Sequence, residues 1–264
     1  MLSLPNAGHG AARWRAPRTL RFVPDAHFAD PRLAAIYDDL DDDRSDLDHY
    51  VQLVVEHEAR SILDVGCGTG SLACRLAQLG RNVTGVDPAE ASLDVARRKP
   101  FAEAVRWIHG TTAQLPELAV DIAMMTGNVA QVFLSDNEWV EMLSHIHSAL
   151  DHSGVLVFET RVPARRGWEE WMPEMTRRSV NITNVGVVEY SVNLLDVSLP
   201  FVSFRSTYRF ANDEVILTSD STLRFRELNE LHDSLEFAGF RIRDVRDAPD
   251  RPGREYVVIA EAKA

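Results

Sequence analysis

An apolar run that begins at Ile62 leads directly into three glycines at alternate positions, Gly66, Gly68 and Gly70. Helix-forming residues follow, and a second apolar run ends in Asp87. Glycines between a strand and a helix allow a tight turn that brings a ligand against main-chain N–H groups at the helix N-terminus. The stretch therefore predicts one βαβ unit with a nucleotide-sized site at the carboxyl ends of its strands.

Apolar runs and helical periodicities alternate along the chain as far as Thr160. The expected strands are residues 62–65, 83–86, 105–108, 120–125 and 155–158. The expected helices are residues 31–38, 47–57, 72–79, 88–98 and 136–150. The fourth strand is apolar on both faces, as a central parallel strand should be. This alternation predicts a doubly wound parallel sheet with helices on both of its faces.

From about residue 177 the pattern changes to long alternating segments, residues 185–197, 201–210 and 214–225, with a hairpin turn at Asn212 and Asp213. A helix over residues 228–237 and strands over residues 240–245 and 256–260 follow. We therefore expect four parts: an N-terminal arm (1–30), an α/β core (31–176), an antiparallel β insertion over the substrate side (177–225), and a closing helix with the last two core strands (226–264).

The overall charge and composition argue against several classes of partner. The 264 residues carry a formal net charge of -12, whereas binding to a nucleic-acid backbone needs neutralising Lys and Arg. No apolar run approaches the roughly 20 residues that span a bilayer, and the first residues lack the apolar stretch of a secretory signal. Cys67 and Cys74 fit no metal-ligand pattern and favour a reduced state. We expect a cytoplasmic protein with no metal, nucleic-acid or membrane partner.

Two carboxylates narrow the class of ligand. Asp87 ends the second strand, where an acid can accept two hydrogen bonds from a ribose diol. Asp64 lies beside the glycine loop, where its charge would repel the pyrophosphate of a dinucleotide and attract the ammonium and sulfonium of S-adenosylmethionine. The dinucleotide alternative stays open on spacing alone, because Gly68, Gly70 and Ala73 fit that fingerprint in a shifted register.

Residues 63–70, Leu-Asp-Val-Gly-Cys-Gly-Thr-Gly, and residues 85–87, Gly-Val-Asp, resemble the cofactor motifs of class I S-adenosylmethionine-dependent methyltransferases. The resemblance implies an α/β fold with a doubly wound, mostly parallel seven-stranded sheet, here with an antiparallel β insertion near the C-terminus. In that family the glycine loop holds the methionine part of the cofactor, and the acid after the second strand holds the ribose. The implied cofactor contacts are Asp64, Gly66, Cys67, Gly68, Gly70 and Asp87.

The resemblance implies further cofactor contacts outside these two motifs. In the family, the residue after the ribose-binding acid packs on the adenine, which points to Pro88. The family usually has Gly-Asp after the third strand; this chain has Gly-Thr-Thr, so Thr111 and Thr112 are expected to supply the adenine contact. Members that act on small amines and amino sugars often carry Tyr-Asp before the first long helix, and Tyr37 resembles that tyrosine. Asn128 is expected between cofactor and substrate.

Substrate and catalytic candidates follow the fourth and fifth strands, because ligands bind outside the carboxyl ends of parallel strands. Asn128 and Glu159 are the catalytic candidates, and Glu159 would bind a cationic acceptor or take its proton. The expected substrate contacts are Gln131, Glu159, Arg161 and Trp168. Two alternatives stay open: Glu159 and Arg161 pair with other charges, and Trp168 packs in the core.

We predict methyl transfer from S-adenosylmethionine to an amine or hydroxyl of a small molecule by in-line displacement, which depends on alignment and exclusion of water. One alternative is a protein that binds S-adenosylmethionine or S-adenosylhomocysteine without turnover. A less favoured alternative is an NAD(P)-dependent reductase. The β insertion either covers the substrate site or forms the surface of a homodimer.

Overall fold

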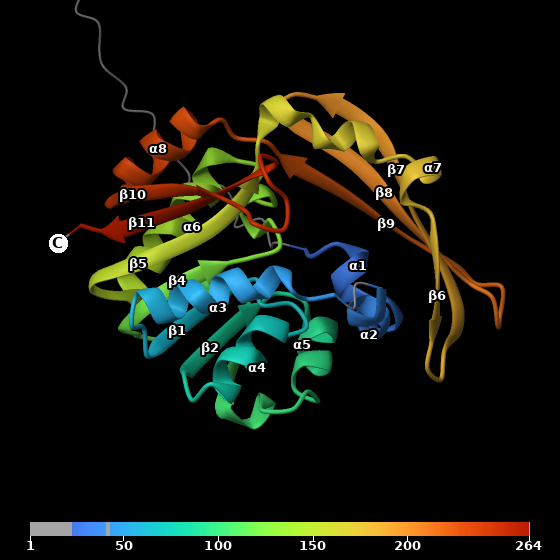
Figure 1. The fold of residues 1–264 in the computed structure, drawn as a ribbon, viewed down its shortest axis with the longest axis horizontal. Helices are drawn as coiled ribbons and strands as arrows, with labels where there is room; N and C mark the ends of the chain where they lie inside the picture. The colour runs from blue at the N-terminus through green and yellow to red at the C-terminus, as the bar shows by residue number, and fades with distance from the viewer. Residues whose placement is uncertain (1–22, 41–42, 264) are drawn as a thin grey trace, which may run out of the picture.

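The computed structural model describes residues 23–40 and 43–263. Most of the predicted N-terminal arm, residues 1–22, lies outside the described residues. The described chain forms an α/β core, and a separate curved sheet extends to one side of it (Figure 1). None of the described helices is long and apolar enough to cross a membrane.

The core contains a seven-stranded sheet. Its strands are β1 (Ser61–Val65), β2 (Asn82–Asp87), β3 (Val105–His109), β4 (Val120–Met125), β5 (Leu150–Arg161), β10 (Phe240–Asp247) and β11 (Glu255–Ala262). Their order is β10-β11-β5-β4-β1-β2-β3, and β11 runs antiparallel to both of its neighbours. The other neighbouring strands are parallel. The predicted doubly wound, mostly parallel seven-stranded sheet is therefore confirmed.

The described part of the chain also contains α-helices, several of which cover the seven-stranded sheet. They are α1 (Ala26–Ala29), α2 (Pro31–Leu40), α3 (Asp46–Glu56), α4 (Ser71–Gln78), α5 (Glu90–Ala96), α6 (Asp136–Ala149), α7 (Pro173–Thr176) and α8 (Leu228–Phe237). Helix α6 begins at the predicted place because Ser135 and Glu138 form a reciprocal capping box, which satisfies backbone N–H groups at its first turn. The helical pattern and its start signal thus agree.

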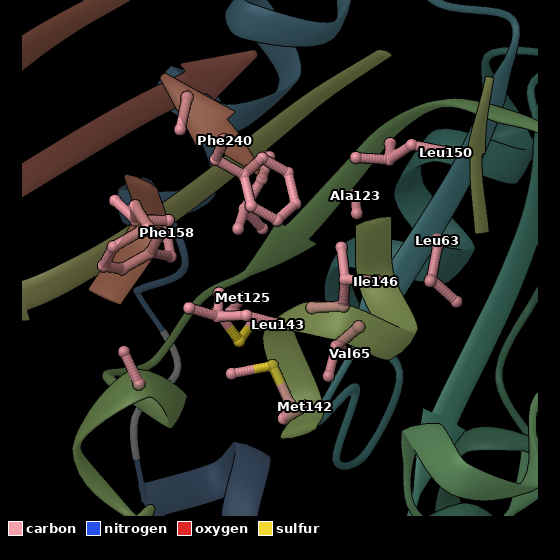
Figure 2. Close-up of a cluster of buried hydrophobic side chains, with 14 of the residues drawn as sticks. Leu63, Val65, Ala123, Met125, Met142, Leu143, Ile146, Leu150, Phe158 and Phe240 are labelled. Carbon is pink, nitrogen blue, oxygen red and sulfur yellow. The ribbon is translucent and has the colours of Figure 1, made fainter. Parts of the chain in front are cut away.

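Two buried clusters lie on the two faces of the sheet. One cluster packs α6 and α8 against the sheet, with Met142, Leu143 and Ile146 of α6 near Phe158 and Phe240 of the strands (Figure 2). The other packs α3 and α4 against the opposite face. Burial of such large apolar side chains stabilises the fold by about 1.5–3 kcal/mol each. Both faces must be apolar, which explains why the central strands lack polar alternation.

The predicted β insertion forms a separate four-stranded antiparallel sheet. Its strands are β6 (Arg178–Ile182), β7 (Gly186–Ser198), β8 (Phe201–Phe210) and β9 (Ile216–Arg224), in that order. The expected hairpin turn at Asn212 and Asp213 joins β8 to β9. Strand β6 was not expected, because its sequence Arg-Ser-Val-Asn-Ile is mostly polar and it lies at an edge of this sheet.

The short helices α1 and α2 lie between the core and the insertion (Figure 1). Leu33 and Ile36 of α2 pack with Val188, Tyr208 and Phe210 of the insertion. The same helix also contacts α5 of the core. Residues 26–29, which the sequence analysis assigned to the N-terminal arm, are therefore helical and packed between two larger units.

Candidate functional site

A cavity of about 530 Å³ opens at the carboxyl ends of the central strands, in the size range of small-molecule sites. We call one part of its lining the glycine-loop wall; it consists of Asp64–Thr69, Ser71, Leu72, Val86–Pro88 and Gly110–Thr112. We call another part the arm wall; it consists of Val23–Asp25, Phe28, Val132–Leu134, Glu138, Asp220 and Thr222. Tyr37, Arg44, Leu47, Thr126, Gly127 and Val129 complete the lining.

The three predicted glycines all adopt positive φ angles, which side chains rarely tolerate. A Cβ at Gly66 would lie 2.6 Å from a methyl group of Val129, and one at Gly70 would lie 2.5 Å from the Trp107 ring. A Cβ at Gly68 would meet nothing within 4 Å. Gly66 and Gly70 thus allow the loop to pack, whereas Gly68 leaves its surface free toward open space.

Asp87 organises the glycine loop from the end of β2. Its carboxylate accepts hydrogen bonds from the backbone N–H of Gly68 at 2.8 Å and of Ala89 at 2.7 Å. Burial raises the pKa of Asp87, and these two hydrogen bonds oppose that rise. Because each carboxylate oxygen accepts more than one hydrogen bond, Asp87 can also receive hydroxyl groups of a ligand in the cavity.

Asp64 is a buried carboxylate that lines the same cavity. It is 1% exposed, and its Oδ1 has no hydrogen-bond partner among the described residues. Burial, followed by the nearby charge of Asp87, raises the pKa of Asp64 to about 7, and Arg44 opposes this rise. An unpaired buried carboxylate is costly unless a ligand supplies a donor or positive charge. Asp64 therefore favours a cationic group at this position.

Arg44 is a cavity residue that the sequence did not single out. Its guanidinium donates to Asp46 at 3.2 Å and 3.4 Å. Burial opposes the charge of Arg44, but its contacts with Asp46 leave its pKa raised overall. Arg44 and Asp64 thus provide opposite charges in one cavity, and an amino acid carries the two complementary groups. Arg44 lies in an acidic stretch, residues 41–48, whose composition is typical of a solvated loop, so the sequence did not indicate that it would line a cavity.

Tyr37 lines the cavity, and the neighbouring Asp38 fixes its helix against the glycine loop. The Asp38 carboxylate accepts from Thr69 Oγ1 at 2.8 Å and from Ser71 Oγ at 3.1 Å. It also pairs with Lys99 at 2.7 Å. In this pair, Asp38 therefore anchors α2 to the glycine loop, and Tyr37 lines the cavity.

The remaining predicted cofactor residues lie in different surroundings. Pro88, Thr111 and Thr112 line the cavity. Thr111 also caps the short 3₁₀ turn Thr112–Gln114, and Thr112 Oγ1 lies 3.2 Å from Nδ1 of His145. Cys67 lines the cavity as a buried loop residue, and burial raises the pKa of its thiol well above the usual value. The thiol is therefore protonated near neutral pH.

Neither of the two catalytic candidates, Glu159 and Asn128, lines the cavity. Glu159 is 7% exposed and accepts hydrogen bonds from Tyr50 Oη and from the backbone N–H of Asn128, the latter at 2.9 Å. The side-chain amide of Asn128 donates through Nδ2 to Glu255 Oε1 at 3.1 Å. These contacts hold the segment 126–129, of which Thr126, Gly127 and Val129 do line the cavity. Glu159 and Asn128 thus support the wall from behind.

The expected substrate contacts Gln131, Arg161 and Trp168 are also outside the cavity lining. Arg161 Nη1 donates to Gln131 Oε1 at 2.9 Å, and Gln131 is fully buried. Trp168 packs edge-on against Phe225 in a buried cluster. Arg161 therefore pairs with Gln131 and Trp168 packs in a buried cluster, while their contact with a substrate stays a prediction. The sequence did not indicate which of the residues at a strand end would face the cavity and which would face the protein interior.

The arm wall joins segments that are far apart in the sequence. Ser221 Oγ of β9 donates to the Asp25 carboxylate at 2.5 Å, and the His27 backbone N–H donates to Ser219 Oγ at 2.8 Å. His27 also contacts Tyr208 of β8 through its ring nitrogen. Sequence reasoning missed Asp25 and Asp220, because no local pattern indicates that residues near opposite ends of the chain meet.

Comparison with known proteins agrees with this architecture. Residues 62–154 match a family model described as a methyltransferase domain. A methyltransferase of Geobacillus sp. (strain WCH70) is 28% identical over 216 residues, which cover 77% of this chain and 85% of that protein. The match with a methyltransferase of Oceanobacillus iheyensis, 29% identical over 114 residues, spans only 53% of that relative.

Solved structures show the same fold at low identity. The sugar N-methyltransferase KedS8 from Streptoalloteichus sp ATCC 53650 has a TM-score of 0.73 at 17% identity, covering 97% of this chain and 100% of that one. The S-adenosylmethionine-bound amino pentose methyltransferase CalS10 from Micromonospora echinaspora has a TM-score of 0.69 at 18% identity, covering 87% and 95%. Together with the matched methyltransferase domain over residues 62–154, these structures show that the chain has the fold of S-adenosylmethionine-dependent methyltransferases.

Proposed function

We propose that this enzyme transfers a methyl group from S-adenosylmethionine to an amine or hydroxyl of a small molecule by in-line displacement. The observation that carries the proposal is Asp64, a buried carboxylate with an unpaired oxygen in the cavity beside the glycine loop. A cationic ligand suits this position, whereas the pyrophosphate of a nicotinamide dinucleotide would be repelled. The reductase alternative is disfavoured on the same ground.

The residues of the glycine-loop wall fit the parts of S-adenosylmethionine. Asp64 would accept from the methionine ammonium, Arg44 would pair with the methionine carboxylate, and Asp87 would accept from the ribose hydroxyls. Gly68 would allow close approach of the ligand to the backbone, and Pro88 with Thr112 would contact the adenine. When bound, the cofactor supplies an activated methyl group on a sulfonium sulfur.

The protein's own contribution to the transfer would be alignment and exclusion of water. The arm wall and the glycine-loop wall enclose one cavity, so an acceptor bound at the arm wall would be held near the donor. A neutral amine acceptor attacks without a strong base, and no such base is required of Glu159. The proposed transfer to a neutral amine therefore proceeds without a general base.

A small acceptor is favoured over a nucleic acid for two reasons. The net charge of -12 opposes binding to phosphate backbones. The structurally similar KedS8 is described as a sugar N-methyltransferase, and CalS10 as an amino pentose methyltransferase. We extend this small-molecule chemistry to the present chain. A role of the β insertion in covering the acceptor is proposed in preference to a homodimer surface.

The proposal is tested with the purified protein, S-adenosylmethionine, and a set of small amines and alcohols. We expect release of S-adenosylhomocysteine together with a methylated product identified by mass spectrometry. Replacement of Asp64 by Asn should weaken cofactor binding, whereas Asp213→Asn at the exposed hairpin should leave it unchanged. Preferential binding of NADPH, or tight salt-sensitive binding of tRNA in place of small acceptors, would contradict the proposal.

A further inference from the structure

The described lining of the arm wall includes three carboxylates and no Lys or Arg. Asp25, Glu138 and Asp220 line the cavity there. Arg44 is the one Lys or Arg among the described lining residues, and its guanidinium is bonded to Asp46. If the cofactor occupies the glycine-loop wall, as proposed above, the acceptor must contact the remaining lining. The electrostatic environment that it meets is therefore negative.

Two of these three carboxylates already have strong partners. Asp220 forms a two-pronged ion pair with Arg205, with N–O distances of 2.6 Å and 2.7 Å. Glu138 is used in the capping box of α6, where it accepts from Ser135 Oγ at 2.7 Å. Asp25, in contrast, is partly buried and accepts one hydrogen bond, from the Ser221 hydroxyl, whereas Glu138 is exposed and accepts two from Ser135; no cation pairs with Asp25 among the described residues. Asp25 is therefore the carboxylate left for a ligand.

The surroundings of Asp25 disfavour the ionised form of its carboxyl group. Burial raises the pKa of Asp25, the Ser221 hydrogen bond partly opposes this rise, and the charge of Asp220 adds to it. A positive group beside Asp25 would compensate both the burial and the repulsion. Phe28 and Phe133, which also line the cavity, offer apolar surface for the body of such a ligand.

We propose that Asp25 binds a protonated amine of the methyl acceptor at a position other than the atom that is methylated, and so selects small cationic amines over neutral alcohols of the same shape. Asp25 comes from the segment before α1 and is held by Ser221 of β9, so this specificity requires the arm and the β insertion to act together. The inference rests on the proposed function, because it assigns the acceptor to the part of the cavity that the cofactor leaves free.

The test uses the full chain saturated with S-adenosylhomocysteine and two matched pairs of probes: cyclohexylamine with cyclohexanol, and benzylamine with benzyl alcohol. Binding is measured by calorimetry at pH 7.5. We expect the amine of each pair to bind about tenfold more tightly than the alcohol, the scale of one charge-assisted hydrogen bond. Equal binding of amine and alcohol by the unaltered protein would overturn the inference.

Variants then assign the preference to one residue. Asp25→Asn should reduce the preference to less than about twofold, whereas Asp25→Glu should retain it. Asp220→Asn removes a charge from the same wall, but one that is paired with Arg205, and should also retain the preference. Full preference in Asp25→Asn, or its loss in Asp220→Asn alone, would contradict the proposal.

A separate titration distinguishes failure of this inference from failure of the proposed function. Affinity for S-adenosylhomocysteine should be the same in the unaltered protein and in Asp25→Asn, because Asp25 lies in the arm wall. Absence of cofactor binding in the unaltered protein would refute the proposed function. Normal cofactor binding without any preference for amines would refute only the role of Asp25.

Discussion

The glycine-loop wall comes mainly from one βαβ unit, in which residues 64–72 and Val86–Pro88 follow neighbouring parallel strands. The arm wall, in contrast, brings together residues 23–28, 132–134 and 220–222 from three distant parts of the chain. The first wall is held by backbone hydrogen bonds and by turns at glycines with positive φ, a conformation that glycine adopts without strain. The second depends on single side-chain contacts, such as that of Asp25 with Ser221. A local motif thus forms the side of the cavity proposed for the cofactor, and long-range packing forms the side proposed for the acceptor.

The largest effect should come from adding a side chain inside the glycine loop. Gly70→Ala would force a Cβ at positive φ to within 2.5 Å of the Trp107 ring and 2.8 Å of Ala96. We expect the free energy of unfolding to fall by about 2–5 kcal/mol, from backbone strain and overpacking together. Denaturant titration measures this loss. Gly68→Ala is the matched control; it shares the positive φ but meets no atom within 4 Å, and should lose about 1–2 kcal/mol.

Equal losses in the two variants would mean that packing of Gly70 contributes nothing beyond its backbone conformation.

Cofactor affinity adds a second comparison. Because Gly68 leaves open space at the loop surface, Gly68→Val should block the cofactor while the fold survives. Normal affinity of that variant would place the cofactor away from the loop.

The next effect concerns the acid at the end of β2. Asp87→Ala removes the acceptor for the Gly68 and Ala89 N–H groups and the proposed ribose contact. We expect binding of S-adenosylmethionine to weaken by about 1.5–3 kcal/mol. Calorimetry measures this change, and Asp94→Ala on the exposed side of α5 is the control. Unchanged affinity in Asp87→Ala would show that the ribose is held elsewhere.

A smaller effect should appear with pH, through Asp64. Its pKa is raised from 3.8 to about 7 in the folded protein. This carboxyl therefore adds stability that is fully present below its unfolded value and is lost as the pH rises through about 7. Binding of a cation needs the ionised form, so cofactor affinity should rise by about fivefold from pH 6 to pH 7. Asp64→Asn should bind weakly and without this rise; a rise that persists in the variant would assign it to another group.

The smallest effect should come from the arm wall. Ser221→Ala removes one hydrogen bond to Asp25, worth about 0.5–1.5 kcal/mol. We expect faster amide hydrogen exchange confined to residues 23–30, with global stability nearly unchanged. Ser203→Ala, whose hydroxyl meets Thr222 at 2.8 Å within the same sheet, is the control. Uniform acceleration across the core would show that the two walls are not independent.

Sequence patterns predicted the central sheet well because its strands are buried on both faces and its helices repeat apolar residues on one face. The cavity-lining residues of the glycine loop and Asp87 could also be predicted, since turns and strand ends bring them to the same edge of the sheet. Glu159, Gln131 and Trp168 were expected at the substrate but are buried outside the cavity lining. A strand end specifies the edge of the sheet, but not whether a side chain points into the cavity or into the protein.

The sequence alone determined the parallel core, the glycine turn and the acidic character of the ligand site, because each depends on local conformation and on the periodicity of apolar residues. Only the tertiary structure decided that Tyr50 and Asn128 would bind Glu159, and that Asp25 would meet Ser221. These contacts join residues 31 to 196 positions apart. Such pairings arise from the packing of whole elements, and no short stretch of sequence encodes them.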